Sequence, residues 1–236
     1  MKVLIATPTY SWGLPIDLVK YLDNIKVPNG WWVWKCYISR TPIHMARNLA
    51  LEEMLKGDYD FVIMNDDDQI PIWEDCFYNL LKENKDMISW LVRLRAKQEN
   101  LNILKTEIYS EEWNQGMYKY VNYKECKEKE VFEIWNAWSW LICLSKKVCK
   151  FMLDKYASQP FEQKATIYMK LIDWTRQEAG YNDDKVDMSL WKPQLCRRVL
   201  SEDYLFFERA IRWGYKLYCQ PNSKVIHLWE QQKIIV

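Results

Sequence analysis

Several features that would assign a protein to a broad class are missing from this chain. Lysine and arginine number 33 against 32 aspartates and glutamates, a formal net charge of +1, and a chain without a positive excess gives no support for a nucleic-acid partner. No apolar run approaches the roughly 20 residues that span a bilayer. The apolar start soon enters a turn, so it is too short for a signal peptide. We therefore expect no membrane span and a cytoplasmic location.

The cysteines do not form the pattern of a disulfide framework. There are seven, an odd number, and no two have CxxC spacing, which redox and zinc motifs use. This usage is typical of a reduced, intracellular protein in which cysteine serves as a small apolar residue. The chain of 236 residues contains no internal repeat and no low-complexity linker. Its length suits one large domain or two small, tightly fused ones.

Aromatic residues are abundant, with fourteen tryptophans and fifteen tyrosines. Most are expected in the core, but exposed rings stack on sugars, bases or partner proteins. The composition therefore indicates a binding surface without naming its ligand. An aromatic-rich surface is also compatible with a homodimer.

Strands alternate with helices in the predicted structure of the first part of the chain. Apolar runs predict strands over 2–6, 31–39, 60–65 and 86–92. Between them, helices are predicted over 17–22, from Pro42 to Gly57 with Thr41 as the cap, and over 73–84 after Pro71. This alternation predicts an α/β fold with a parallel sheet.

The chain changes character after residue 95. Residues 95–130 are polar and predict loops and a hairpin, whereas 131–144 are apolar, aromatic and strand-rich, and a helix is predicted over 145–156. Residues 159–192 show no clear pattern. A further helix follows Ser201 as its cap and ends at Gly214. Short strands are predicted over 215–219 and 224–228.

Three consecutive aspartates, Asp66, Asp67 and Asp68, follow the third predicted strand. Adjacent like charges repel, so either water solvates them in a turn or a cation binds them. Ligands of open α/β sheets bind beyond the carboxyl ends of strands. If the extended conformation persists, Asp66 and Asp68 point the same way and Asp67 the opposite way, and two such carboxylates suit Mg²⁺ or Mn²⁺. Taken alone, the triplet is explained more simply as an aspartate-rich turn.

Two later features bear on this choice. Glu202 and Asp203 open a helix, where acids complement the helix dipole without any chemistry. His227, one of two histidines in the chain, ends a short apolar run, where a histidine is more often structural than a ligand. The residues alone leave the structural and the functional explanation open.

The order of these features resembles the GT-A nucleotide-sugar glycosyltransferases, particularly the family 2-like enzymes of phages, viruses and bacteria. KVLIATPTY resembles the family's first strand and nucleotide-binding loop. ARNLALEEMLKGDYDFVIMNDDDQIP resembles its helix, strand and DxD motif. LSEDYLFFERAIRWGYKLYCQPNSKVIH resembles its ED helix, Gly-aromatic turn and late histidine. The matches run in order over almost the whole chain, which makes the set more specific than any single motif.

The resemblance implies one GT-A domain over 1–236, with a Rossmann-like nucleotide-sugar-binding sheet flanked by helices and a smaller acceptor-side sheet. The nucleotide-sugar-binding half would cover about 1–95 and the acceptor-binding half about 96–236. The implied activity is metal-dependent transfer of a sugar from a UDP- or GDP-activated donor to a hydroxyl of a glycan, a protein or a small molecule. Inversion is expected, although similar motifs also serve retaining enzymes.

The family's motifs imply roles for individual residues. Mn²⁺ or Mg²⁺ would be bound by Asp68, Asp66 and His227, and Asp66 or the less certain Asp67 would contact the donor. Asp203 would be the general base for the acceptor hydroxyl, a role worth roughly 10²–10⁴-fold in rate, and Glu202 would assist it by orienting the acceptor. The nucleoside pocket would be lined by Thr7, Pro8 and Tyr10.

Two further sets of residues are candidates by position. Arg47 and Asn48 lie where relatives keep the same pair, and Arg47 would bind the donor diphosphate in a bidentate manner; an ion pair with an acid is equally favoured. Acceptor sugars would stack on Trp135, Trp138 and Trp140, for which the sheet core is the alternative. Relatives often have glycine-rich sequence where this chain has WNAWSW, and SWGLPIDLV matches no subgroup closely, so donor and acceptor identity stay open.

Two other classes of function also stay open. A metal-dependent nucleotidyltransferase places acids at strand ends too, but usually carries a glycine-rich basic loop early in the chain. Residues 7–19 contain one glycine and no lysine or arginine, which argues against that class. A non-catalytic sugar- or nucleotide-binding relative fits the tryptophans, whereas the intact DxD, ED and His motifs argue against a decayed site.

Overall fold

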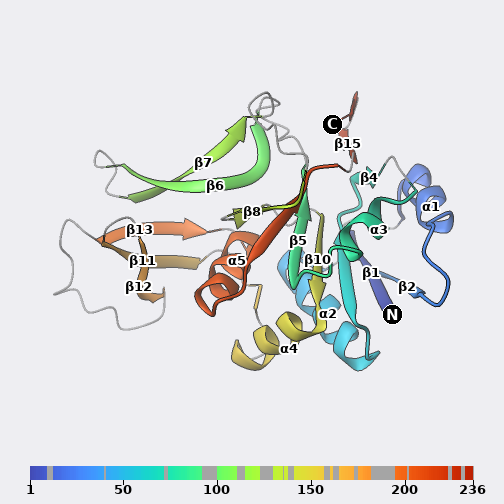
Figure 1. Ribbon diagram of the computed structural model, residues 1–236, viewed down its shortest axis with the longest axis horizontal. Coiled ribbons are helices and arrows are strands. Elements are labelled where there is room, and N and C mark those ends of the chain that lie inside the picture. The colour runs from blue at the N-terminus through green and yellow to red at the C-terminus, as the bar shows by residue number, and fades with distance from the viewer. Residues whose placement is uncertain are drawn as a thin grey trace.

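The computed structural model describes residues 1–9, 13–39, 41–71, 74–91, 100–110, 115–122, 130–134, 136–137, 141–156, 160–161, 165–172, 175–181, 195–200, 202–222, 225–229 and 232–235. A mixed seven-stranded sheet with helices on both faces forms the body of the protein (Figure 1). The predicted α/β fold class, a sheet flanked by helices, is confirmed.

The order of strands in the main sheet joins distant parts of the chain. It runs β2 (Trp32–Ser39), β1 (Lys2–Thr9), β3 (Phe61–Asn65), β10 (Leu141–Ser145), β5 (Met87–Trp90), β14 (Leu217–Gln220) and β8 (Phe132–Ile134). As predicted, β1 is parallel to β2 and to β3. β5 runs in the same direction as β3, because β10 lies between them and is antiparallel to both. The strands of the first part of the chain are thus parallel as predicted, and β10, from later in the chain, makes the sheet mixed. The fully buried run of β10 has the same apolar pattern in either direction, and its direction cannot be read from that pattern.

Helices cover the two faces of the sheet through alternating side chains of its strands. Leu4 and Ala6 of β1 pack in the cluster that contains α2 (Ile43–Lys56), α4 (Lys146–Lys155) and α5 (Glu202–Arg212). Val3 and Ile5 pack on the opposite face, with α1 (Ile16–Asp23) and α3 (Cys76–Leu81). A strand buried on both faces is nearly continuously apolar, which explains the burial of β1 from its second residue onward.

Three smaller sheets accompany the main one. Their orders are β7 (Gln115–Asn122), β6 (Asn100–Ser110), β9 (Asn136–Ala137); β12 (Thr175–Tyr181), β11 (Ala165–Ile172), β13 (Leu195–Leu200); and β16 (Gln232–Ile235), β15 (Val225–Trp229), β4 (Gln69–Pro71). The antiparallel pair β6–β7 confirms the predicted hairpin. In Figure 1 this pair and the β11–β13 sheet lie on the same side of the main sheet, at the left. Within the described part of the chain, no helix has the length and apolar character that a membrane span requires.

Two prolines occupy positions that differ from the prediction. Pro42 is itself the cap of α2, in an extended conformation with ψ of 141°, so Thr41 lies too far from the helix to cap it and its hydroxyl donates instead to the Ser39 carbonyl at 3.1 Å. Pro71 does not open a helix but ends β4, opposite Val225. Since β4 is the edge strand of its sheet, a residue without an N–H is tolerated there.

Gly214 ends α5 in a backbone conformation that favours glycine. Its φ is +86°, and a Cβ added there would meet no atom within 4 Å. We therefore expect Gly214→Ala to lower the free energy of unfolding by about 1 kcal/mol through backbone strain alone, measured by urea denaturation. Gly13→Ala, where a Cβ also meets nothing and φ is not in the left-handed region, is the control. Equal stability of the two variants would contradict the expectation.

Candidate active site

The carboxyl ends of β1 and β3 meet at one edge of the main sheet. Ala6 pairs with Met64, so Thr7 and Asn65 come next on neighbouring strands. The three aspartates follow directly after β3. This is the edge at which α/β sheets bind their ligands.

The aspartates form a turn and do not continue the strand. The backbone N–H of Gln69 donates to the backbone carbonyl of Asp66 at 3.1 Å. The side-chain amide of Asn65 donates to the backbone carbonyls of Asp66 and Gln69 at 2.9 and 3.0 Å. The extended conformation does not persist, because Asn65 and Gln69 close the chain into a turn, so the condition for Asp66 and Asp68 to point the same way as in a strand is not met. Asp66 nevertheless diverges from Asp67, whose carboxylate accepts a hydrogen bond from the Thr9 hydroxyl on β1.

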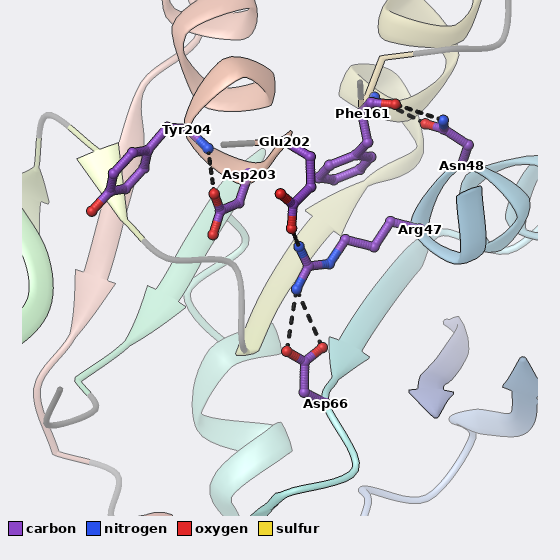
Figure 2. A network of polar contacts seen from close by, with 7 residues as sticks. All are labelled: Arg47, Asn48, Asp66, Phe161, Glu202, Asp203 and Tyr204. Atoms are coloured by element: carbon purple, nitrogen blue, oxygen red, sulfur yellow. Dashed lines mark hydrogen bonds and ion pairs between the residues drawn. The ribbon is translucent and has the colours of Figure 1, made fainter. Parts of the chain in front are cut away.

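Arg47 of α2 joins the aspartate turn to the start of α5. Its side chain is 2% exposed, its Nη1 donates to Glu202 Oε1 at 2.8 Å, and its Nη2 donates to both carboxylate oxygens of Asp66 at 3.2 and 3.3 Å (Figure 2). Burial lowers the pKa of Arg47, but the carboxylates of Asp66, Asp203 and Glu202 raise it by more. Of the two arrangements left open by the sequence, the described structure contains the ion pair with acids.

Asp203 lies beside this pair in the first turn of α5. It is 2% exposed, and its Oδ1 accepts the backbone N–H of Tyr204 at 2.8 Å (Figure 2). The hydrogen bond to its own helix fixes the carboxylate next to Glu202. The two acids that the sequence places on one helix thus reach the same buried region as Asp66.

Asn48 contributes to the framework of the site. Its Nδ2 donates to the Phe161 carbonyl at 2.8 Å, and its Oδ1 accepts the Phe161 N–H at 2.9 Å. The Phe161 ring stacks on Phe206 of α5 with centroids 4.3 Å apart, and the Arg47 guanidinium lies 5.9 Å from the Phe161 ring centre. Both the oxygen and the nitrogen of the amide bind backbone, so in this structure Asn48 anchors Phe161. A contact between Asn48 and the donor, which the resemblance implies, stays a prediction.

Several buried polar atoms near the turn have no hydrogen-bond partner among the described residues. They are Thr7 Oγ1, Asn65 Oδ1, and both Oε1 and Nε2 of Gln69. Buried polar groups are nearly always paired in proteins, so these atoms mark a place that water, an ion or a ligand completes. Thr7 was predicted from the sequence, whereas Thr9, Asn65 and Gln69 were not. The signal for these three residues is a polar side chain at the end of an apolar strand.

The strand that carries His227 lies against the aspartate turn. In the pairing of β15 with β4, His227 is opposite Gln69, the residue after Asp68. The backbone of His227 is therefore brought to this edge of the sheet from far along the chain. Its side chain lies outside the described part, as do Tyr10 and the three tryptophans Trp135, Trp138 and Trp140. Pro8 is buried on β1.

The donor atoms at this edge suit a hard cation. They are the carboxylates of the turn together with two side-chain amide oxygens, Asn65 Oδ1 and Gln69 Oε1, which have no partner among the described residues. Mg²⁺ and Mn²⁺ prefer such oxygens. Within the described residues, no group of three or more His, Cys, Asp or Glu side chains is gathered as metal ligands. A dication here would compete with Arg47 for Asp66.

The charge of Asp66 depends on this surrounding. Burial raises its pKa, the Arg47 guanidinium lowers it, and the carboxylates of Asp68 and Asp67 raise it again, to a net value of about 7. Since the ordinary value is 3.8, the folded protein binds a proton at Asp66 more tightly than the unfolded chain does. Ionising Asp66 above neutral pH therefore costs stability.

We expect this proton to appear in the pH dependence of stability. The stabilisation from protonated Asp66 is complete below about pH 4, decreases as the pH rises and is lost above pH of about 7. In metal-free buffer, the free energy of unfolding of the wild type, measured relative to Asp66→Asn, should fall between pH 5 and pH 8. Asparagine cannot ionise, so it removes this contribution. Parallel pH curves for the two proteins would show that Asp66 does not titrate in this range.

Comparison with solved structures finds a similar fold in A197 from STIV. The TM-score is 0.55 at 14% identity, over 100% of this chain and 94% of that chain. At such low identity the likeness shows the fold alone. A weaker likeness is to 4-diphosphocytidyl-2C-methyl-D-erythritol synthase from Anaerococcus prevotii, with a TM-score of 0.40 and 10% identity over 68% of this chain and 77% of that chain. Another is to mannose-1-phosphate geranyltransferase from Thermus thermophilus, with a TM-score of 0.38 and 10% identity over 66% of this chain and 60% of that chain. These two scores are too low to support an argument. No protein-family model and no curated protein matches the sequence.

Proposed function

We propose that this chain is a metal-dependent glycosyltransferase of the GT-A type, which moves a sugar from a UDP- or GDP-sugar to an acceptor hydroxyl. The observation that carries the proposal is the pair of contacts made by Arg47. They join the acid at the end of β3 to the acid at the start of α5. These contacts support the proposal that the two acidic motifs named by the resemblance contribute to one site at the carboxyl ends of β1 and β3.

The residues of the turn would hold the donor and the metal. Asp66, Asp68 and His227 would bind Mn²⁺ or Mg²⁺, and a bound dication supplies positive charge that stabilises the leaving diphosphate. The unpartnered hydroxyl of Thr7 offers a hydrogen bond to the nucleoside, with Pro8 and Tyr10 beside it. The carboxylate of Asp67, held by Thr9, shapes the loop around the donor.

Asp203 would act as the general base. It accepts the proton of the acceptor hydroxyl while that oxygen forms a bond to the anomeric carbon. The bond from this carbon to the diphosphate breaks and its electron pair leaves with the diphosphate, so the configuration inverts. Glu202 would stay with Arg47, which donates to its Oε1.

One observation favours a second candidate, a non-catalytic binder of sugars or nucleotides. Arg47 neutralises Asp66 and engages Glu202, and a guanidinium in such a place opposes a dication. Binding without turnover would leave this ion pair intact. Turnover therefore decides between the two candidates.

A thermal-shift panel tests the proposal first by binding. UDP-, GDP-, CDP- and dTDP-sugars are each added with and without Mn²⁺, because a ligand of the folded state raises the melting temperature. We expect a UDP- or GDP-sugar to raise it in the presence of Mn²⁺, and Asp68→Ala to abolish that shift. Asp58→Ala, at an exposed acid paired with Lys146, is the matched control. Unshifted melting with every nucleotide sugar would contradict the proposal.

Hydrolysis assays with the same donors and Mn²⁺ then test turnover. Release of free sugar and nucleoside diphosphate supports a glycosyltransferase. Binding with no release supports the non-catalytic binder. Formation of a nucleotide sugar from a nucleoside triphosphate and a sugar phosphate would identify a nucleotidyltransferase instead.

A further inference from the structure

A hollow of about 570 Å³ lies at the end of the main sheet opposite the candidate active site. Its lining includes Asp86, which precedes β5, and Lys216, which precedes β14. At this end Ser145 pairs with Phe61, the first residue of β3, and its N–H donates to the Asp86 carbonyl. The aspartate turn follows the last residue of β3, roughly 15 Å away along the strand. The hollow is therefore separate from the site described above.

Aromatic rings form one wall of the hollow. The Phe151 ring lies 5.7 Å from Trp213 and 5.5 Å from Tyr215, centre to centre. Trp213 is 51% exposed, yet its Nε1 donates to the Tyr156 hydroxyl at 3.2 Å. The Lys155 ammonium lies 4.2 Å from the centre of this ring. The part of the indole that is exposed is held in a fixed orientation, which prepares it for stacking.

Lysines surround these rings and make the hollow positive. The Lys85 ammonium lies 4.6 Å from the centre of the Tyr218 ring, and that of Lys147 lies 5.4 Å from the Tyr215 ring. Lys216 also lines the hollow, and one acid, Asp86, is among the lining residues. Counting Glu133, the ion-pair partner of Lys216, three lysines face two acids, which leaves an excess of one positive charge.

The ion pairs of these lysines are weak competitors for a ligand. Lys147 pairs with Asp86 at 3.0 Å and Lys216 with Glu133 at 2.9 Å, and both lysine side chains are more than half exposed. Exposed pairs of this kind contribute little to stability. An incoming anion can therefore replace either acid at small cost.

We propose that the hollow binds a sugar that carries an anionic group, a carboxylate or a phosphate. The C–H face of a sugar ring stacks on the aromatic wall, and the anion accepts hydrogen bonds from the lysines. A neutral sugar leaves the lysines unused, and a small inorganic anion leaves the rings unused. The volume falls within the about 300–1,000 Å³ of small-molecule sites. The proposal does not depend on the chemistry of the candidate active site.

Calorimetric titration of the full chain in metal-free, low-salt buffer tests this site. The probes are glucuronic acid, glucose 6-phosphate, glucose and inorganic phosphate. We expect at least one of the two charged sugars to bind ten-fold or more tightly than both glucose and inorganic phosphate. The charged sugar that binds more tightly shows whether the site prefers a carboxylate or a phosphate. Rising salt should weaken that binding.

Variants locate the binding. Trp213→Ala and Lys85→Met should each weaken the charged sugar at least ten-fold. The matched controls Trp32→Ala and Lys56→Met, both at exposed positions elsewhere, should not change it, and neither should Asp68→Ala. Should Trp213→Ala fail to fold, Lys85→Met decides, because the methionine keeps the apolar part of the side chain.

Three results would overturn the proposal. The first is that no charged sugar binds. The second is that glucose or inorganic phosphate binds as tightly as the charged sugars. The third is that binding survives Lys85→Met or is lost with Asp68→Ala.

Discussion

Asp203→Asn is expected to lower kcat for sugar transfer by about 10²–10⁴-fold while nucleotide-sugar binding is retained. Asparagine has nearly the shape of aspartate, and its carbonyl oxygen still accepts the Tyr204 N–H that holds Asp203 now. The fold and the donor site should therefore persist, whereas the proposed general base is lost. Initial rates and thermal shifts with the best donor measure the two quantities separately.

The control for this variant is Asp154→Asn, at an exposed aspartate of α4 that pairs with Lys150. Its rate and binding should equal those of the wild type. Transfer at the normal rate by Asp203→Asn would show that another group is the base. Loss of donor binding together with the rate would instead assign Asp203 to the pocket.

Arg47→Met is expected to lower the free energy of unfolding by about 3–5 kcal/mol, because removing one partner leaves buried carboxylates uncompensated. Asp66 and Glu202 lose their direct contacts with the guanidinium, and Asp203 loses the favourable charge of Arg47. The loss of stability should be smaller at pH 5 than at pH 8, because at pH 5 Asp66 is protonated and leaves no charge uncompensated. Chemical denaturation at the two pH values measures both effects.

Neutral partners should rescue this variant. Arg47→Met combined with Asp66→Asn and Glu202→Gln removes the charges together and should recover much of the lost stability. Lys56→Met on the same helix removes an exposed cation and should change stability by less than about 0.5 kcal/mol. If the triple variant is no more stable than Arg47→Met, the packing of Arg47 on the Phe161 ring, and not its charge, stabilises the site.

The local parts of the fold could be predicted from the sequence. The alternation of β1, α1, β2, α2 and β3 follows from short apolar runs and helical spacing, which each segment carries by itself. The place of β10 could not be predicted in this way. Its position between β3 and β5 depends on pairing with segments far away in the chain, and a buried apolar run is compatible with several neighbours and with both directions.

The candidate site shows the same division. Asp66 and Glu202 were named because each belongs to a recognisable motif, but their common partner was visible only once Arg47, 155 residues before Glu202, was in place. Asn48 was assigned by analogy of position, whereas the register of α2 turns its amide towards Phe161. The proximity of His227 to the aspartate turn follows from the pairing of β15 with β4, which no pattern in either strand indicates.

The central position of β10 has a consequence for synthesis on the ribosome. Until Leu141–Ser145 has left the exit tunnel, β3 and β5 have no strand between them, and each exposes unpaired amides and an apolar surface. The nascent chain therefore carries an open, aggregation-prone edge from the emergence of β3 until the emergence of β10. Protection by a chaperone that recognises apolar segments would be most useful in that interval, and closure of the sheet then depends on a slow, long-range search.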